Sequence, residues 1–185
     1  VPPTHSRSTA EIPPGKVDDP DPGEGERGRG FVIRLSEMEQ YIARAVARAR
    51  YATQRRRGID DGKIGPQSTE QTDLEGIAGE MAFCKDQNLY PDFSTEQGHL
   101  ADAISHSGHT IDVKTTRLRS GRLLVGLEKK NKPCDRYVLV AGKFPEYEII
   151  GWAASAEVFR DENLGKPTGI QIETYFLEQE QLRKF

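Results

Sequence analysis

The sequence predicts a single mixed α/β (α+β) domain, in which helices flank a central mixed sheet, behind a disordered N-terminal tail. Three observations predict this architecture: the proline-, glycine- and charge-rich residues 1–30, two segments with helical apolar spacing, and short alternating segments after Pro91. Two helices, several strands and a last short helix favour one layered domain. We expect the tail to span residues 1–30 and the domain to span residues 31–185.

Composition excludes several classes of protein. The chain has 185 residues, 35% of them hydrophobic. No run reaches the roughly 18 apolar residues of a membrane helix, so no membrane partner is expected, and no secretory signal is visible. The two cysteines, Cys84 and Cys134, are too few for a disulfide framework and fit a reducing cytoplasm. We expect Cys84 in the core and Cys134 in a loop.

Two helices are predicted from capping signals and apolar spacing. Ser36 with Glu39, and Thr72 with Glu75, form capping boxes at the two predicted starts, with a loop over residues 58–71 between the helices. A stripe on the first helix is expected to face the core: Met38, Tyr41, Ile42, Ala45, Ala49 and Ala52. The arginines off this stripe are interpreted as a solvated face or as phosphate contacts.

Two glycines interrupt the second predicted helix. Gly76 and Gly79 each cost about 1 kcal/mol relative to alanine, so we expect another group to approach the helix closely there. Gly76 lies one turn before Glu80 on the same side. We therefore expect it to clear space beside the Glu80 carboxylate.

The segment after Pro91 is expected to form short strands over residues 100–105, 109–116, 123–127, 136–141 and 147–152. A three-residue loop with Gly108 in the left-handed conformation would join the first two strands as a hairpin. This register places Asp102 opposite Asp112, with Lys114 on the same face. Val113 is expected to point the other way, into the core.

Two directly opposed carboxylates repel each other unless a cation offsets their charge. A hard divalent cation such as Mg²⁺ binds carboxylate oxygens and can activate water and stabilise a leaving oxygen. Lys114 could orient that water or offset charge on the phosphorus. The alternative is a carboxylate–lysine pair on a solvated sheet face.

The order of these residues along the chain resembles the PD-(D/E)XK nuclease superfamily. Gly79-Glu80 on a helix, then Asp102, then Asp112-Val113-Lys114 on a strand match its pattern. The segments DLEGIAGEMAF, HLADAI, IDVKTTRLRSGRLLV, DRYVLVAG and YEIIGWA follow one another as in small phage-encoded members. The resemblance covers about residues 72–153 and implies the restriction-endonuclease-like fold.

The resemblance also implies the roles of the matching residues. Asp102 and Asp112 would hold Mg²⁺ or Mn²⁺, and the main-chain carbonyl of Val113 would add a ligand. Lys114 would act on the attacking water. Glu80 would assist in binding the metal or the water, as the helical carboxylate does in many members.

Two departures from the superfamily pattern are of kinds that the superfamily tolerates, and the shorter Asp112 side chain leaves the number of metal ions open. Ala101 stands where the proline of the name would be, and Asp112 stands where glutamate is more common. The implied activity is a metal-dependent deoxyribonuclease in phage DNA metabolism, acting in the host cytoplasm. The alternative is a non-catalytic DNA-binding or interaction module on the same fold. Endonuclease or exonuclease action, RNA as substrate and a homo-oligomer stay open.

Charge is distributed unevenly along the chain. Residues 31–58 carry seven basic and two acidic residues, and residues 101–143 carry nine basic and four acidic ones, although the formal net charge is −3. Basic side chains beside a carboxylate site suit a DNA backbone. The predicted DNA contacts are Arg117, Arg119, Arg122, Lys129 and Lys130, with a solvated loop as the alternative.

Other residues that could carry chemistry are interpreted as structural. His99, His106 and His109 flank Asp102 and could indicate zinc, but the last two lie at the predicted turn and no cysteine is close in the sequence, so surface histidines are favoured. Trp152 is expected to pack beneath a strand rather than to stack on a base.

Overall fold

A computed structural model describes residues 31–56, 69–95 and 101–185 of the chain. The predicted tail over residues 1–30, His99 and most of the predicted loop over residues 58–71 lie outside the described residues. The described part is a mixed α+β structure with a mixed sheet flanked by helices. None of its helices combines the length and the apolar character needed to cross a membrane.

The helices and strands alternate only in part along the chain. They are β1 (Val32–Arg34), α1 (Glu37–Arg56), α2 (Thr69–Asp86), β2 (Ala103–Ile104), β3 (Thr110–Thr116), β4 (Leu123–Val125), the 3-10 helix η1 (Leu127–Asn131), β5 (Arg136–Lys143), β6 (Glu146–Ala154), α3 (Ser155–Val158), the 3-10 helix η2 (Asp161–Asn163), β7 (Leu164–Gly165), β8 (Thr174–Leu177) and the 3-10 helix η3 (Gln179–Gln181).

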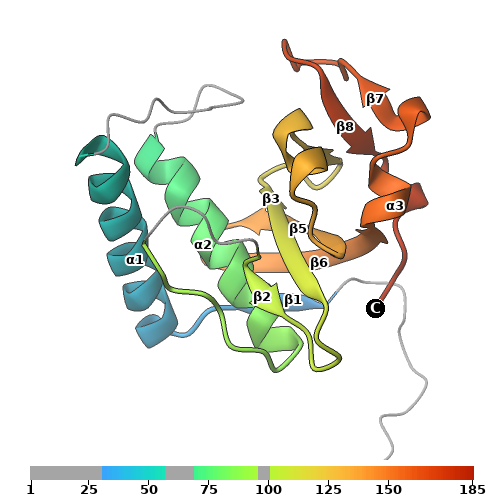
Figure 1. The fold of residues 1–185 in the computed structure, drawn as a ribbon. Coiled ribbons are helices and arrows are strands. Elements are labelled where there is room, and N and C mark those ends of the chain that lie inside the picture. Colours follow the sequence, from blue (N-terminus) through green and yellow to red (C-terminus); the bar gives the residue numbers. More distant parts are fainter. Residues whose placement is uncertain (1–30, 57–68, 96–100) are drawn as a thin grey trace, which may run out of the picture.

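The described strands form two sheets. The larger has the order β1-β6-β5-β3-β2, with β3 and β5 parallel and the other pairs antiparallel. The smaller is antiparallel, with the order β4-β8-β7. Figure 1 shows α1 and α2 on one side of the larger sheet and β7, β8 and α3 on the other. The larger sheet is therefore covered on both faces.

Helix α2 lies between α1 and the sheet (Figure 1) and is therefore almost wholly buried along its second half. It belongs to a core that includes residues of both helices and of β1, β3, β5 and β6. The helical apolar spacing predicted for this segment, at Leu74, Ile77, Ala78, Met81 and Cys84, is confirmed: Leu74 packs partly buried against the core and the other four are buried. Its predicted start at Thr72 is wrong: the helix already includes residues 69–71.

The capping box of α1 is confirmed, but its predicted core stripe is wrong except at Ile42, which packs partly buried against the same core. Ser36 N–H donates to Glu39 Oε2 at 2.6 Å, and Glu39 N–H donates to Ser36 Oγ at 3.3 Å. Met38 and Tyr41 are about two-thirds exposed or more, at 67% and 70%. The buried positions are Ala43 and Ala47, whose small side chains can bring α1 close to α2.

The close approach expected at the two helical glycines occurs at one of them. A Cβ atom built on Gly79 would lie 2.0 Å from Thr115 Oγ1 and 3.0 Å from Thr115 Cβ, so the absence of a side chain lets β3 contact α2. A Cβ atom on Gly76 would have no neighbour within 4 Å. The expectation that Gly76 clears space beside the Glu80 carboxylate is not supported, because no atom of the Glu80 side chain lies within 4 Å of that Cβ position.

The opposite face of the sheet packs against a second core built from β4, β8 and α3. Its largest members include Tyr137, Leu123 and Leu139. The sequence pattern predicts the strand β4 and the helix α3 as elements, without placing them in this layer, and it predicts neither β7 nor β8. Cys134 follows η1 in a loop, as predicted, but it is buried in this core.

The β2–β3 hairpin has the predicted register. Ala103 pairs with Ile111, Ser105 N–H donates to His109 O at 2.9 Å, and Gly108 has a φ of 85° in the left-handed region. Asp102 N–H also donates to Ile111 O, at 2.8 Å, although Ile111 is paired with Ala103, so the regular pairing stops at Ala103 and the predicted direct pairing of Asp102 with Asp112 is wrong. The strand β2 itself is only two residues long, because the pairing changes at Asp102.

Candidate functional site

The side chain of Asp102, the residue before β2, makes the last hydrogen bond between that arm of the hairpin and β3. Its Oδ2 accepts a hydrogen bond of 2.7 Å from the main-chain N–H of Val113. A carboxylate oxygen therefore takes the position at which another strand residue would offer a carbonyl group. The Asp102 carboxylate is held against the backbone of β3, at the edge of the larger sheet.

Asp112 lies in the middle of this edge and is almost wholly buried, with 2% of its surface exposed. Its Oδ1 lies 2.6 Å from Lys114 Nζ, and its Oδ2 accepts a hydrogen bond of 2.6 Å from Lys129 Nζ. The contact with Lys114 is ionic but lacks hydrogen-bond geometry, so Oδ1 is a buried acceptor without a hydrogen bond. Asp112 therefore contacts two lysines from different elements.

Glu80 approaches the same edge from α2. Its Oε2 and Oε1 lie 3.1 Å and 3.3 Å from Arg50 Nη1. The guanidinium group also donates to the main-chain carbonyls of Asp92 at 2.8 Å and Ser94 at 3.2 Å. Arg50 thereby joins α1, α2 and the segment that precedes Asp102.

The three carboxylates influence one another electrostatically. Burial, followed by the charge of Asp102, raises the pKa of Glu80 to about 8, against the opposing effect of Arg50. Burial, followed by the charge of Asp112, raises the pKa of Asp102. At Lys129, burial favours the neutral form, but the Asp112 carboxylate outweighs burial and raises the pKa of the ammonium group. The carboxylates of Glu80, Asp102 and Asp112 therefore lie near enough for their charges to interact.

The carboxylates meet around a sheet edge rather than on one face. Val113 lies in the core beneath α2, as predicted, and Asp112 and Lys114 alternate with it toward the second core. Glu80 comes from the α2 side, and the Asp102 side chain bonds to the backbone between the two faces. The arrangement brings all four predicted catalytic residues to one locality.

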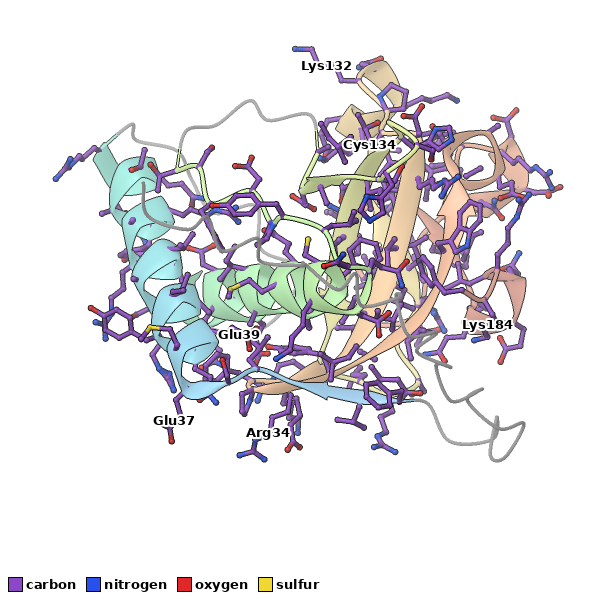
Figure 2. The ribbon with its side chains drawn as sticks, turned by 90° about the horizontal axis from the view of Figure 1, so that it is seen from below. Arg34, Glu37, Glu39, Lys132, Cys134 and Lys184 are labelled. Carbon is purple, nitrogen blue, oxygen red and sulfur yellow. The ribbon has the colours of Figure 1, made fainter. Side chains whose placement is uncertain are left out.

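The predicted DNA-contacting residues have different surroundings. The Nε atom of Arg117 lies 3.4 Å from Glu75 Oε1, and that of Arg122 lies 3.2 Å from Glu178 Oε1. Arg119 is exposed, and Lys130 Nζ donates to Tyr175 OH at 3.0 Å on the outer side of η1. Lys132 projects outward after η1 (Figure 2). Lys129 alone among the five predicted contacts touches a predicted catalytic carboxylate.

The carboxylate oxygens of the site can be compared with the ligands that a divalent ion uses. Across residues 31–56, 69–95 and 101–185, no three His, Cys, Asp or Glu side chains form a group that could hold a metal ion by themselves. Mg²⁺ is usually held by one or two carboxylates together with water and substrate phosphate. Asp102 and Asp112, with the buried Oδ1 of Asp112 lacking a hydrogen bond, fit this smaller donor set.

Sequence reasoning missed two residues that shape the site. Arg50 belongs to the α1 arginines interpreted as a solvated face or as phosphate contacts, yet it follows Ala43 and Ala47 at the spacing i, i+4, i+7. That spacing on the buried face is the signal that could have placed it inward. Lys129 was predicted as a DNA contact, and nothing in the local sequence indicates its ion pair with Asp112, seventeen residues away.

A buried carboxylate outside the predicted site was also missed. Glu75, predicted only as a capping residue, is 5% exposed, and its Oε2 accepts hydrogen bonds from Tyr147 OH at 2.7 Å and from the main-chain N–H of Phe144 at 3.0 Å. Burial, followed by the hydrogen bond to Glu75, raises the pKa of the Tyr147 hydroxyl. These contacts connect α2 to β6 and the turn before it, away from Asp112.

The described histidines and the tryptophan interpreted as structural lie at the surface or in the packing, as expected. His106 and His109 are exposed in the hairpin turn. Trp152 packs partly buried against the first core, with the guanidinium carbons of Arg136 and Arg183 at 4.6 Å and 5.0 Å from its ring centroid. Its indole is therefore part of the packing between β6 and the C-terminal segment.

Comparison with known proteins adds no family assignment. No protein-family model matches the chain, and no curated protein sequence matches it significantly.

Proposed function

We propose that this protein is a metal-dependent deoxyribonuclease with the restriction-endonuclease-like fold of the PD-(D/E)XK superfamily. One observation carries the proposal: Asp102, Asp112 and Lys114 lie together at the β2–β3 edge, and Glu80 reaches the same edge from α2. This is the set of residues, in the chain order, on which the resemblance in sequence rests. The proposed setting is phage DNA metabolism: recombination, repair or degradation.

Each residue of the site has a proposed role. Asp102 and Asp112 hold Mg²⁺ or Mn²⁺, with the Val113 carbonyl as a further ligand. Bound there, the ion supplies positive charge beside the phosphate and makes water more acidic. Lys114 orients the attacking water and offsets the negative charge that builds on the phosphate. Glu80, with its pKa of about 8, exchanges a proton with water near neutral pH.

The DNA backbone would lie along the basic residues that surround this edge. Arg119 and Lys130 are exposed, and Arg122 is half-buried beside Glu178. Side chains of this kind contact phosphates without reading sequence. The proposed partner is therefore DNA, bound chiefly through its backbone.

Cleavage assays test the proposal directly. Plasmid, single-stranded and branched DNA, with RNA as a further arm, are incubated with and without Mg²⁺ or Mn²⁺. We expect cleavage that requires the ion and that falls at least about a hundredfold in Asp102→Ala and Lys114→Ala. Matched controls are Asp86→Ala and Lys143→Ala, which alter exposed residues. Absence of cleavage, or equal cleavage by the site variants, contradicts the nuclease.

A second candidate function is a non-catalytic DNA-binding or interaction module on the same fold. It is favoured by the basic side chains that already neutralise the site: Lys114 and Lys129 contact Asp112, and Arg50 contacts Glu80. Such a module would bind DNA equally well with Mg²⁺ and with a chelator, and would not cut it. Gel-shift titrations under both conditions distinguish the two functions.

A further inference from the structure

Lys129 contacts the carboxylate that the proposed metal requires. Its Nζ lies 2.6 Å from Asp112 Oδ2, while Lys114 Nζ lies 2.6 Å from Asp112 Oδ1. Each oxygen of the buried Asp112 therefore has an ammonium group beside it. A divalent ion that uses an Asp112 oxygen competes with one of the two lysines for the same acceptor.

The two lysines are held in different ways. Lys114 lies within β3, whose residues 111–116 pair with β5 along one side. Lys129 lies in η1, a 3-10 helix of five residues that has no buried residue. Its backbone is bonded locally, with Lys129 N–H donating to Gly126 O at 3.1 Å. The side chain of Lys129 can therefore leave Asp112 without disturbing a sheet or a core.

The charges at this edge indicate where the ammonium group of Lys129 would go once it leaves Asp112. Among the described residues, this edge holds three carboxylates and three basic side chains: those of Glu80, Asp102 and Asp112, and those of Arg50, Lys114 and Lys129. A divalent ion adds two positive charges to this buried locality, so an ammonium group there becomes less favourable. A DNA phosphate brings a negative charge to the same place and is an acceptor for the displaced ammonium group.

We propose that Lys129 is a phosphate-contacting residue with two partners: Asp112 in the metal-free protein, and the DNA backbone once a divalent ion is bound. This inference rests on the proposed nuclease site. It adds a residue that the superfamily pattern at Asp102, Asp112 and Lys114 does not include. It also makes the contact of Lys129 with DNA depend on the metal.

The first test measures binding of Mn²⁺ alone by isothermal titration calorimetry, without DNA. Lys129→Met removes the competing ammonium group and is expected to bind Mn²⁺ about tenfold more tightly than the wild type, the effect of removing one charge-assisted hydrogen bond. Lys130→Met is the matched control, because Lys130 is the next residue of η1 and contacts Tyr175 instead. It should leave Mn²⁺ affinity unchanged.

Folding is checked separately. Lys129→Gln keeps a hydrogen-bond donor for Asp112 but removes the charge, so it replaces the methionine variant if that variant unfolds. Lys129→Arg keeps the competing charge and should bind Mn²⁺ as the wild type does. Circular dichroism of each variant before titration identifies those that are folded.

The second test measures how DNA affinity depends on salt concentration, with Ca²⁺ in place of Mg²⁺ and with a chelator. With Ca²⁺, Lys129→Met should lower the slope of log affinity against log salt by about one relative to the wild type, because one phosphate contact is lost. With the chelator, the two proteins should have the same slope. Lys130→Met should change the slope by the same amount with Ca²⁺ and with the chelator.

The outcomes separate this inference from the function on which it rests. If the wild type binds Mn²⁺ and cuts DNA, but Lys129→Met and Lys129→Gln bind Mn²⁺ no more tightly, the role of Lys129 is overturned and the nuclease stands. Equal salt slopes with Ca²⁺ overturn it as well. If neither the wild type nor a Lys129 variant binds Mn²⁺, both the metal site and this inference are overturned.

Discussion

The main-chain N–H of Val113 donates a hydrogen bond of 2.7 Å to the Asp102 carboxylate, so a residue of the proposed metal site also ends the pairing of a strand. The same side chain has a raised pKa, because it is desolvated and lies near Asp112. Asp102 therefore stabilises the hairpin through its oxygen atom and destabilises it through its charge. These two contributions can be separated by substitution.

Asp102→Asn keeps an acceptor for Val113 N–H and removes the charge, whereas Asp102→Ala removes both. We expect the asparagine variant to be at least as stable as the wild type. The alanine variant should lose about 1–3 kcal/mol, the cost of a buried N–H without a partner. Urea denaturation measures both, with Asp86→Asn and Asp86→Ala as exposed controls. Equal losses in the two Asp102 variants would show that the hydrogen bond is not the stabilising element.

The pH dependence of stability should report on Glu80. Its pKa is about 8 in the folded protein against an ordinary value of 4.5, so the folded state binds more protons than the unfolded state between these values. The free energy of unfolding should therefore decrease as pH rises through that range, by at most about 1.4 kcal/mol per pH unit from this group. Asp102, whose pKa is also raised, acts in the same direction.

Glu80→Gln should flatten this decrease, because glutamine does not titrate. Denaturant unfolding at a series of pH values between about 5 and about 8 measures the difference. Glu37→Gln, an exposed change at the start of α1, should keep the dependence of the wild type. An unchanged pH dependence in Glu80→Gln would mean that Glu80 is ionised throughout.

Local patterns in the sequence were sufficient for the part of the site that lies in one hairpin. Gly108 fixes the turn, and the turn fixes the register as far as Ala103, which brings Asp102 beside β3. The small sheet was missed because β7 has two residues and β8 has four, too few for an alternating pattern to be distinguished. The bounds of α2 were displaced because the capping box assigned to Thr72 lies within the helix.

The missing parts of the site depend on contacts that are distant in sequence. Arg50 reaches Glu80 across thirty residues, and Tyr147 reaches Glu75 across seventy-two. The spacing of Arg50 after Ala43 and Ala47 indicates the buried face of α1 but not the partner, and nothing local indicates that Tyr147 contacts Glu75. The capping-box interpretation likewise gave Glu75 a local role and concealed its buried one. Contacts of this kind, between residues far apart in the sequence, are determined by the packing of helices on the sheet.

Tyr147→Phe tests whether the buried Glu75 is a structural residue. The change removes a hydroxyl that donates at 2.7 Å and leaves Glu75 Oε2 with the N–H of Phe144. We expect a loss of about 1–3 kcal/mol in the free energy of unfolding. Cleavage of DNA at temperatures where the variant is folded should be unchanged. Tyr90→Phe, at a tyrosine that is 81% exposed, is the control, and a selective loss of cleavage in Tyr147→Phe would place Glu75 in the site instead.

The two glycines of α2 provide a matched pair for the contact that holds the helix against β3. Gly79→Ala would place a methyl group 2.0 Å, 2.9 Å and 3.0 Å from the Oγ1, Cγ2 and Cβ atoms of Thr115, so no rotation of the threonine side chain relieves the overlap. We expect it to destabilise the protein by about 1–3 kcal/mol and to move α2, and with it Glu80, away from the sheet edge. Gly76→Ala meets nothing within 4 Å and should stabilise the helix by up to about 1 kcal/mol. Thermal unfolding of both variants measures the difference, and similar stabilities would show that α2 does not depend on close contact with Thr115.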